Sequence, residues 1–146
     1  MAWRDALENI GHGCVPNTFG VLASQTMEGG NFACGITTDS FVRPGADTAN
    51  FLTKGIVPSS VTSVVEGLVS GTHNCQVISG IACWMTNDGT NPVVKATDQG
   101  HVCYVKSATS VCAAAGSANS IVAGIVLDVD ATKGVKIWIP AGGYPA

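Results

Sequence analysis

Apolar and polar positions alternate most regularly in two short runs between residues 125 and 139. Side chains of an extended chain alternate between its two faces, so each run predicts a strand with one buried face. The expected inward positions are Ile125, Leu127, Val129, Val135, Ile137 and Ile139. A short connection containing Gly134 joins the two runs, and Pro140 follows the second because proline cannot donate a ladder hydrogen bond. The pattern therefore predicts a β-hairpin.

Shorter apolar segments, separated by turn-forming residues, predict further strands along the chain. They are residues 19–24, 32–37, 61–69, 75–85, 93–95 and 101–106. The segment 61–69 is rich in β-branched residues, which favours a strand, although Ser63 and Glu66 have the spacing of a helix start. Strands at intervals of roughly 8–12 residues are typical of all-β proteins. We therefore expect an all-β fold: an antiparallel β-sandwich, a jelly roll or a small barrel.

The first 50 residues differ in character from the rest. Trp3, Leu7 and Ile10 have the spacing of one helix face, and Gly11-His12-Gly13 ends that short helical stretch. Glycines and prolines then interrupt the chain repeatedly. We expect residues 1–50 to form an irregular N-terminal arm with short strands, not an independent domain, and residues 51–146 to form the compact β domain.

Charged residues make up only 12% of this 146-residue chain, against a usual share of about a quarter. Either the chain buries surface against copies of itself or a partner, or its surface is neutral and rich in small polar residues. The first reading predicts a homo-oligomer or an assembly component. With a net charge of −3 and no cluster of Lys or Arg, nothing indicates nucleic-acid binding, and no apolar run approaches a membrane span.

The N-terminal sequence carries Arg4, Asp5 and Glu8 and no apolar core, so it is not typical of a secretory signal. We therefore expect a protein made in the cytoplasm. In that compartment its six cysteines are expected to be mostly reduced and to pack as small apolar residues, not to form disulfides.

Each of the three histidines lies two residues before a cysteine. These pairs, the candidate metal ligands, are His12 and Cys14, His73 and Cys75, and His101 and Cys103. On a strand, positions i and i+2 share a face, so each pair can present nitrogen and sulfur to zinc. Structural zinc sites usually contain tighter pairs, so packing is the favoured interpretation and we expect no metal and no cofactor. No nucleophile motif or phosphate-binding loop is present, so the sequence predicts no enzyme.

Two tryptophans are candidate contact residues with another protein. Trp138 falls opposite the expected inward face of its strand, and an outward tryptophan on a β-protein is often an interface anchor. Trp3, near the start of the arm, is a similar candidate. The alternative for Trp138 is a position buried between two layers.

Residues 98–105 (DQGHVCYV), 122–130 (VAGIVLDVD) and 135–140 (VKIWIP) resemble the C-terminal strands of capsid decoration proteins, or cement proteins, of tailed bacteriophages. In that family a strand is followed by a small-residue loop, an Ala-Gly-hydrophobic strand and a final valine-rich strand. The resemblance covers about the last third of the chain; residues 1–60 match no family, and the six cysteines are not a feature of the decoration proteins.

The resemblance implies a non-enzymatic structural protein of the virion. Such a protein is assembled in the host cytoplasm, binds the outer surface of the icosahedral head, often as a homotrimer, and clamps neighbouring major capsid protein subunits. Stabilising a shell requires only binding to the assembled state, so no catalytic residue is needed.

Two other functions remain open. The first is a β-sandwich binding module of a phage tail or fibre that recognises carbohydrate or protein, for which exposed aromatic residues lining a groove are expected. The second is a small metal-dependent enzyme built on the His-x-Cys pairs, which stoichiometric zinc in the purified protein would indicate.

Overall fold

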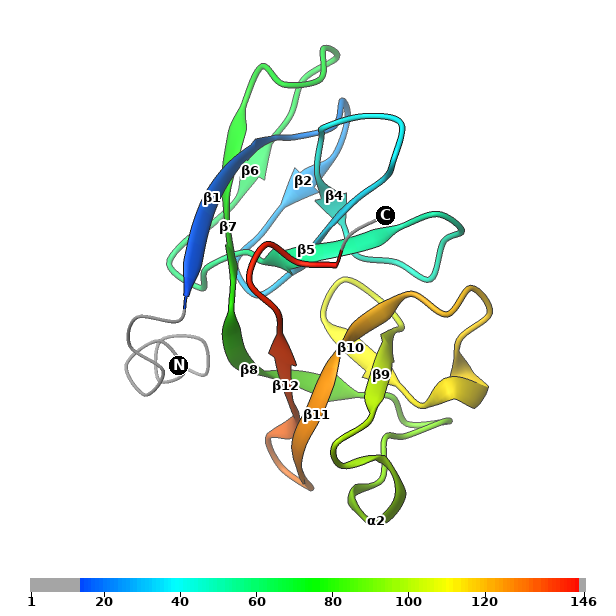
Figure 1. The fold of residues 1–146 in the computed structure, drawn as a ribbon. Helices are drawn as coiled ribbons and strands as arrows, with labels where there is room; N and C mark the ends of the chain where they lie inside the picture. Colours follow the sequence, from blue (N-terminus) through cyan, green and yellow to red (C-terminus); the bar gives the residue numbers. More distant parts are fainter. Residues whose placement is uncertain (1–13, 145–146) are drawn as a thin grey trace.

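The computed structural model describes residues 14–144 (Figure 1). Its strands are β1 (Val15–Gly20), β2 (Thr26–Met27), β3 (Phe32–Gly35), β4 (Arg43–Pro44), β5 (Leu52–Ile56), β6 (Val64–Val65), β7 (Asn74–Ser79), β8 (Ile81–Asn87), β9 (Val102–Val105), β10 (Ser110–Cys112), β11 (Val122–Asp130) and β12 (Gly134–Ile139). The described helical turns are α2 (Lys95–Asp98) and the 3-10 turn η2 (Ala114–Gly116). The expected all-β class is confirmed.

The strands form three sheets. β1, β7, β5, β3 and β4 make an antiparallel five-stranded sheet in that order, and β2 pairs with β6 alone. β10, β8, β12, β11 and β9 close into a small barrel, in which β10 runs parallel to β8 and the other pairs are antiparallel. Among the three expected architectures, the small barrel describes the second half of the chain.

The five-stranded sheet lies between two apolar clusters because successive residues of its strands point to opposite faces. In β3, Phe32 and Cys34 join the core of the barrel, whereas Ala33 joins a second cluster with β2 and β7. The barrel core contains the fully buried Val135, Ile137 and Ile139 of β12. These three inward positions are as the alternation predicted.

The division between the two halves falls at Gly80, between β7 and β8. Gly80 has a φ of +65°, a conformation that costs glycine little, and it turns the chain from the sheet into the barrel. β1, β3 and β4, which precede residue 50, are part of the same sheet as β5 and β7. The boundary expected at residue 50 thus does not coincide with a sheet boundary. The expected helical stretch 1–10 lies outside the described residues.

The expected face of β11 is wrong at two positions. Val126 is buried, whereas Ile125 and Leu127 point outward with 37% and 39% of their surface exposed. The register shifts between Val126 and Asp128, as a β-bulge requires. The extra residue Leu127 allows Val126 and Val129 both to face the core, which simple alternation forbids.

Two shorter predicted strands also differ. In the segment 61–69 only Val64–Val65 is a strand, because the chain leaves β6 into a loop held by the Glu66 carboxylate. In the segment 93–95, Val93 is fixed instead by the side chain of Asn87, which bonds both its N–H and its carbonyl, and α2 begins at Lys95. Among residues 14–144, no helix has the length and apolar character needed to cross a membrane.

Candidate interaction surfaces

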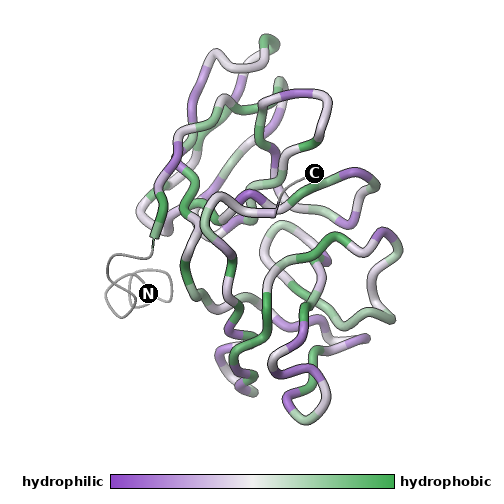
Figure 2. The backbone as a smooth tube through the Cα atoms, viewed as in Figure 1, coloured by the Kyte–Doolittle hydropathy of each residue, from purple (hydrophilic) through white to green (hydrophobic). Residues whose placement is uncertain are grey.

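The loop between β6 and β7 carries the most exposed apolar side chains of the described chain. Leu68 is 91% exposed, Val69 is 69% exposed and Val65, at the end of β6, is 59% exposed. This loop, which we call the tip loop (residues 65–73), projects at the end of the molecule opposite α2 (Figure 1). Figure 2 shows a hydrophobic stretch at its outermost point. Three aliphatic side chains within five residues thus form a small convex apolar surface.

A buried carboxylate supports the tip loop from within. Glu66 accepts hydrogen bonds from the N–H of Gly67 at 2.8 Å and of His73 at 2.9 Å, and the Nδ1 atom of His73 lies 3.5 Å from its carboxylate. The N–H of His73 lowers the pKa of Glu66 below its ordinary value, and the N–H of Gly67 adds to this against the opposing effect of burial. The Glu66 carboxylate therefore joins the two ends of the tip loop, at Gly67 and at His73.

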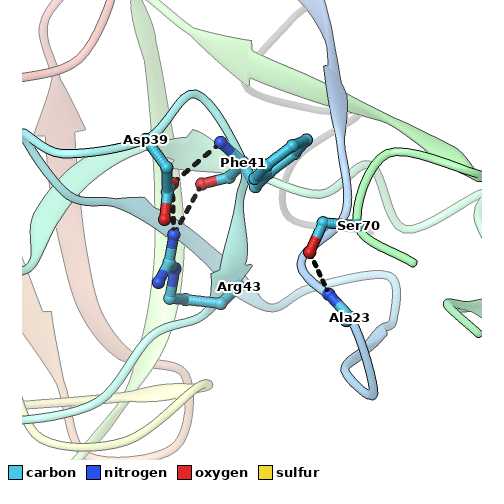
Figure 3. A network of polar contacts seen from close by, with 5 residues as sticks. All are labelled: Ala23, Asp39, Phe41, Arg43 and Ser70. Atoms are coloured by element: carbon cyan, nitrogen blue, oxygen red, sulfur yellow. Dashed lines mark hydrogen bonds and ion pairs between the residues drawn. The ribbon is translucent and has the colours of Figure 1, made fainter. Parts of the chain in front are cut away.

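The segment 21–25 clamps the tip loop from the side. The N–H of Ala23 donates to the Oγ of Ser70 at 2.9 Å, as Figure 3 shows. Three backbone hydrogen bonds, of 2.9 to 3.0 Å, join Ser24 to Gly67, Glu66 to Gln25 and Gly71 to Val21. Gly71, at a φ of +82°, also leaves room for the Phe41 ring, which a Cβ there would approach to 2.9 Å. The apolar residues are thus presented by a fixed backbone.

Charge is scarce in the tip loop and in the segment 21–25 that contacts it. Residues 65–73 and 21–25 contain no Lys or Arg and one carboxylate, that of Glu66. Depletion of charge around exposed apolar side chains is the compositional signature of the centre of a protein–protein interface. This end of the molecule is suited to contact another protein.

A second apolar surface crosses the outside of the barrel. Ala82, Trp138, Ile125 and Val102 pair across β8, β12, β11 and β9, so their side chains share one face. We call these four residues the outer row. Val102 is 42% exposed and Ile125 37%, whereas Ala82 is buried. Trp138 faces away from the barrel core, as expected, but is half-buried because it packs against Ile78, Ile81 and Ala82.

The next row on the same face is charged. Asp128, Lys136 and Trp84 pair across β11, β12 and β8. The Nζ atom of Lys95 lies 2.9 Å from Asp128, and that of Lys133 lies 5.5 Å from the centre of the Trp84 ring. The outer row is therefore apolar with a charged border.

A cleft of about 430 Å³ opens between β1 and the loop 36–42. Phe19, Phe41 and Lys54 contribute to its lining, together with Asp39. Asp39 is engaged by Arg43, whose Nη2 atom also donates to the carbonyl of Phe41 (Figure 3). Burial pushes the pKa of Asp39 upward, but the hydrogen bonds from Arg43 and Phe41 outweigh it and hold the pKa below its ordinary value.

The two His-x-Cys pairs that lie within residues 14–144 do not present nitrogen and sulfur together. His73 and His101 each precede the first residue of their strand, so strand alternation does not align them with the cysteine, and both are exposed. Cys75 and Cys103 are buried. Cys14 is partly buried against the Ile78 cluster, and His12 lies outside the described residues, as does Trp3. Among residues 14–144, no group of three or more His, Cys, Asp or Glu has the arrangement of a metal site.

The cysteines are free thiols. Five are buried: Cys34, Cys75, Cys83, Cys103 and Cys112. Burial raises the pKa of Cys83 and of Cys103 to about 12, with a smaller contribution in each case from a neighbouring buried thiol. Cys34 reaches about 11, also through burial. These thiols pack as small apolar residues, as expected.

Comparisons with protein-family models, curated proteins and solved structures find no match for this chain. The two candidate interaction surfaces are therefore inferred from the exposure and packing of the chain's own residues. The sequence correctly placed Trp138 on the outer face of its strand, and its role as a contact residue stays a prediction; the tip loop was not predicted. The available signal was the pair Leu68-Val69 set among Gly67, Ser70 and Gly71, an apolar pair in a turn-forming context.

Proposed function

We propose that this chain is a structural virion protein: a capsid decoration protein that binds the outer surface of an assembled phage head and stabilises contacts between major capsid protein subunits. The tip loop is the contact with the shell. Binding selectively to the assembled state stabilises that state by mass action and needs no chemistry.

The main support for this proposal is the geometry of the tip loop. Leu68 and Val69 expose aliphatic side chains on a backbone fixed by Glu66 and by the segment 21–25. A preorganised contact loses little conformational entropy on binding, so a small apolar surface contributes more affinity than a flexible one. The surrounding lack of charge removes the cost of desolvating ions.

The sequence resemblance supports the same proposal. The residues that carry it fall on β9, β11 and β12, three of the five barrel strands. A homotrimer follows from the family resemblance, and it is tested independently by the mass of the purified protein in solution.

Co-sedimentation with capsid shells tests the function. The test uses the major capsid protein of the proposed phage, which is expressed, assembled into empty shells and mixed with the purified protein. We expect the protein to sediment with shells and not with unassembled capsid subunits. The proposal is wrong if the wild-type chain stays in the supernatant at every shell concentration tested.

The cleft beside β1 favours a second candidate function, a phage tail or fibre module that binds carbohydrate. Phe19, Phe41 and Asp39 together supply apolar and carboxylate groups to one concave surface. A glycan array probed with the purified chain tests it. Binding that Phe19→Ser abolishes and Leu68→Ser leaves intact would favour this candidate over capsid decoration.

A further inference from the structure

We propose that the outer face of the barrel, which consists of the outer row and the charged row beside it, binds the same face of a second copy of this chain. The two copies are related by a two-fold axis that runs along the strands, midway between β11 and β12. β12 of one copy then lies on β11 of the other. This inference is independent of the proposed capsid function, because the tip loop lies at the opposite end of the molecule and stays free (Figure 1).

Exposed aliphatic side chains gather on this face. Apart from Val94, the large apolar side chains that are exposed among the described residues fall either in the tip loop or on the outside of β9 and β11. Those outside the barrel are Val102, Ile125 and Leu127. The bulge in β11 turns Leu127 outward, so the apolar surface of the outer row continues into the charged row. Apolar surface of this kind gains free energy when a partner removes it from water.

The charged row makes this face complementary to itself. Asp128 of β11 pairs with Lys136 of β12, so two opposite charges lie on either side of the proposed axis. In an isologous contact, residue i of each copy meets residue j of the other. The axis therefore brings Lys136 of each copy to Asp128 of the other, which gives two ion pairs across the interface. Lys95 of the same chain also contacts Asp128, and a carboxylate accepts several hydrogen bonds, so both lysines are accommodated.

The same axis matches the residues of the outer row. Trp138 pairs with Ile125 across β12 and β11, and Ala82 and Val102 lie on the flanking strands β8 and β9. The rotation places Trp138 on Ile125 of the other copy. It also places the small Ala82 opposite the larger Val102. An aromatic ring against an aliphatic side chain, and a small residue facing a large one, allow the two faces to interdigitate.

The match of charges favours a second outer face over the tip loop as the occupant. The tip loop contains no Lys or Arg that could pair with Asp128, and its one carboxylate, that of Glu66, is buried. A contact between two identical faces is closed and does not propagate into a filament. A trimer formed through another surface would associate in pairs through this contact. The number of chains in each particle is therefore even.

Sedimentation equilibrium of the full-length chain tests the proposal. The face is only about 14 Å across, because its four strands lie about 4.8 Å apart, so we expect reversible association in the micromolar range. Lys136→Asp and, separately, Asp128→Lys should each weaken the association at least about tenfold, because like charges then meet twice across the axis. Ile125→Ser should weaken it by removing apolar contact from the centre of the interface.

A mixture of the two charge variants separates an interface effect from an effect within one chain. Each variant carries like charges on β11 and β12 of its own chain, so the pairing within the chain stays broken in the mixture. Across the axis, the two aspartates of the Lys136→Asp chain meet the two lysines of the Asp128→Lys chain. We expect the mixed dimer to be at least about tenfold tighter than either variant with itself.

Two controls lie away from this face. Glu28→Lys reverses an exposed charge between β2 and β3, and Leu68→Ser changes an exposed aliphatic residue of the tip loop; both should leave the association unchanged. Amide exchange at Val126 and Ile137 reports that each variant keeps the barrel core. A wild-type chain that contains one or three chains per particle at every concentration would overturn the proposal. So would charge variants that associate like the wild-type chain, or a mixture that associates no more tightly than its components.

Discussion

Asp47 and Asn119 are joined by a reciprocal pair of hydrogen bonds. The backbone N–H of Asn119 donates to the Asp47 carboxylate at 2.9 Å, and the Asn119 side-chain amide donates to the Asp47 carbonyl at 2.8 Å. The N–H of Ala118 donates to the same carboxylate at 2.7 Å. Since Asp47 lies between β4 and β5 and Asn119 between β10 and β11, the contact ties the five-stranded sheet to the barrel.

Replacing Asp47 by Ala should lower the free energy of unfolding by about 1–3 kcal/mol, because two backbone donors lose their acceptor. Asp98→Ala is the matched control: that half-buried carboxylate accepts one local hydrogen bond, from the N–H of Val94. Its effect should stay below about 1 kcal/mol. Urea denaturation measures both, and equal losses would contradict the linking role of Asp47.

The contact between Asp47 and Asn119 makes the free energy of unfolding depend on pH. Burial pushes the pKa of Asp47 upward, but the hydrogen bonds from Ala118 and Asn119 outweigh it and hold the pKa below its ordinary value of 3.8. The contribution of Asp47 to stability is therefore complete above that value and is lost as pH falls through the lowered pKa. Urea titrations from pH 6 to pH 2 should show a smaller acid loss in Asp47→Ala than in the wild-type chain.

The bulge in β11 reverses what alternation predicts for two neighbouring residues. Val126→Ala should cost about 1.5–3 kcal/mol of stability because Val126 is fully buried, whereas Leu127→Ala should cost well under about 1 kcal/mol. Alternation without a bulge requires the opposite order. Urea denaturation of the two variants decides between the registers, and a larger loss for Leu127→Ala would place the bulge elsewhere.

The sequence predicts the fold class and the β12 face because both depend on local periodicity, which Val135, Ile137 and Ile139 keep throughout the strand. The β11 face is not predictable in this way, since a bulge at Leu127 is set by pairing with β12 and not by composition. The tip loop is not predictable from the sequence for a related reason. Val65, Leu68 and Val69 have the composition of a strand, and only the long-range partners of Glu66 and Gly67 turn the chain outward.

Glu66→Gln should loosen the tip loop without unfolding the barrel. The amide has one carbonyl oxygen where the carboxylate has two acceptors, one for Gly67 and one for His73. Faster amide exchange at Gly67 and His73, with unchanged exchange at Ile137, is the expected result. Glu28→Gln, which changes an exposed carboxylate, is the control. Slower or equal exchange at both loop amides would show that Glu66 does not hold the loop.

Thiol reactivity should divide the cysteines. At pH 8 the native protein should react rapidly at Cys14 alone, since the other five are buried, and all six should react after denaturation. Burial raises the pKa of Cys83 and Cys103, so their contribution to stability is complete below the ordinary thiol value of 9.0 and is lost as pH rises toward 12. Titration with an aromatic disulfide reagent, with Cys14→Ser as the reference, measures the count. Any fast-reacting thiol in native Cys14→Ser would contradict the burial.

Leu68→Ser combined with Val69→Ser should weaken binding to assembled shells by more than tenfold, since each change removes an aliphatic side chain worth about 1.5–3 kcal/mol when fully buried. Folding should be unaffected, because Leu68 is 91% and Val69 69% exposed. Val94→Ser is the matched control: Val94 is 47% exposed beside α2, at the opposite end of the molecule. Co-sedimentation across a range of shell concentrations gives the affinity of each variant. If the double variant binds like the wild-type chain while Val94→Ser does not, the shell contact lies at the barrel end, and the tip loop has another partner.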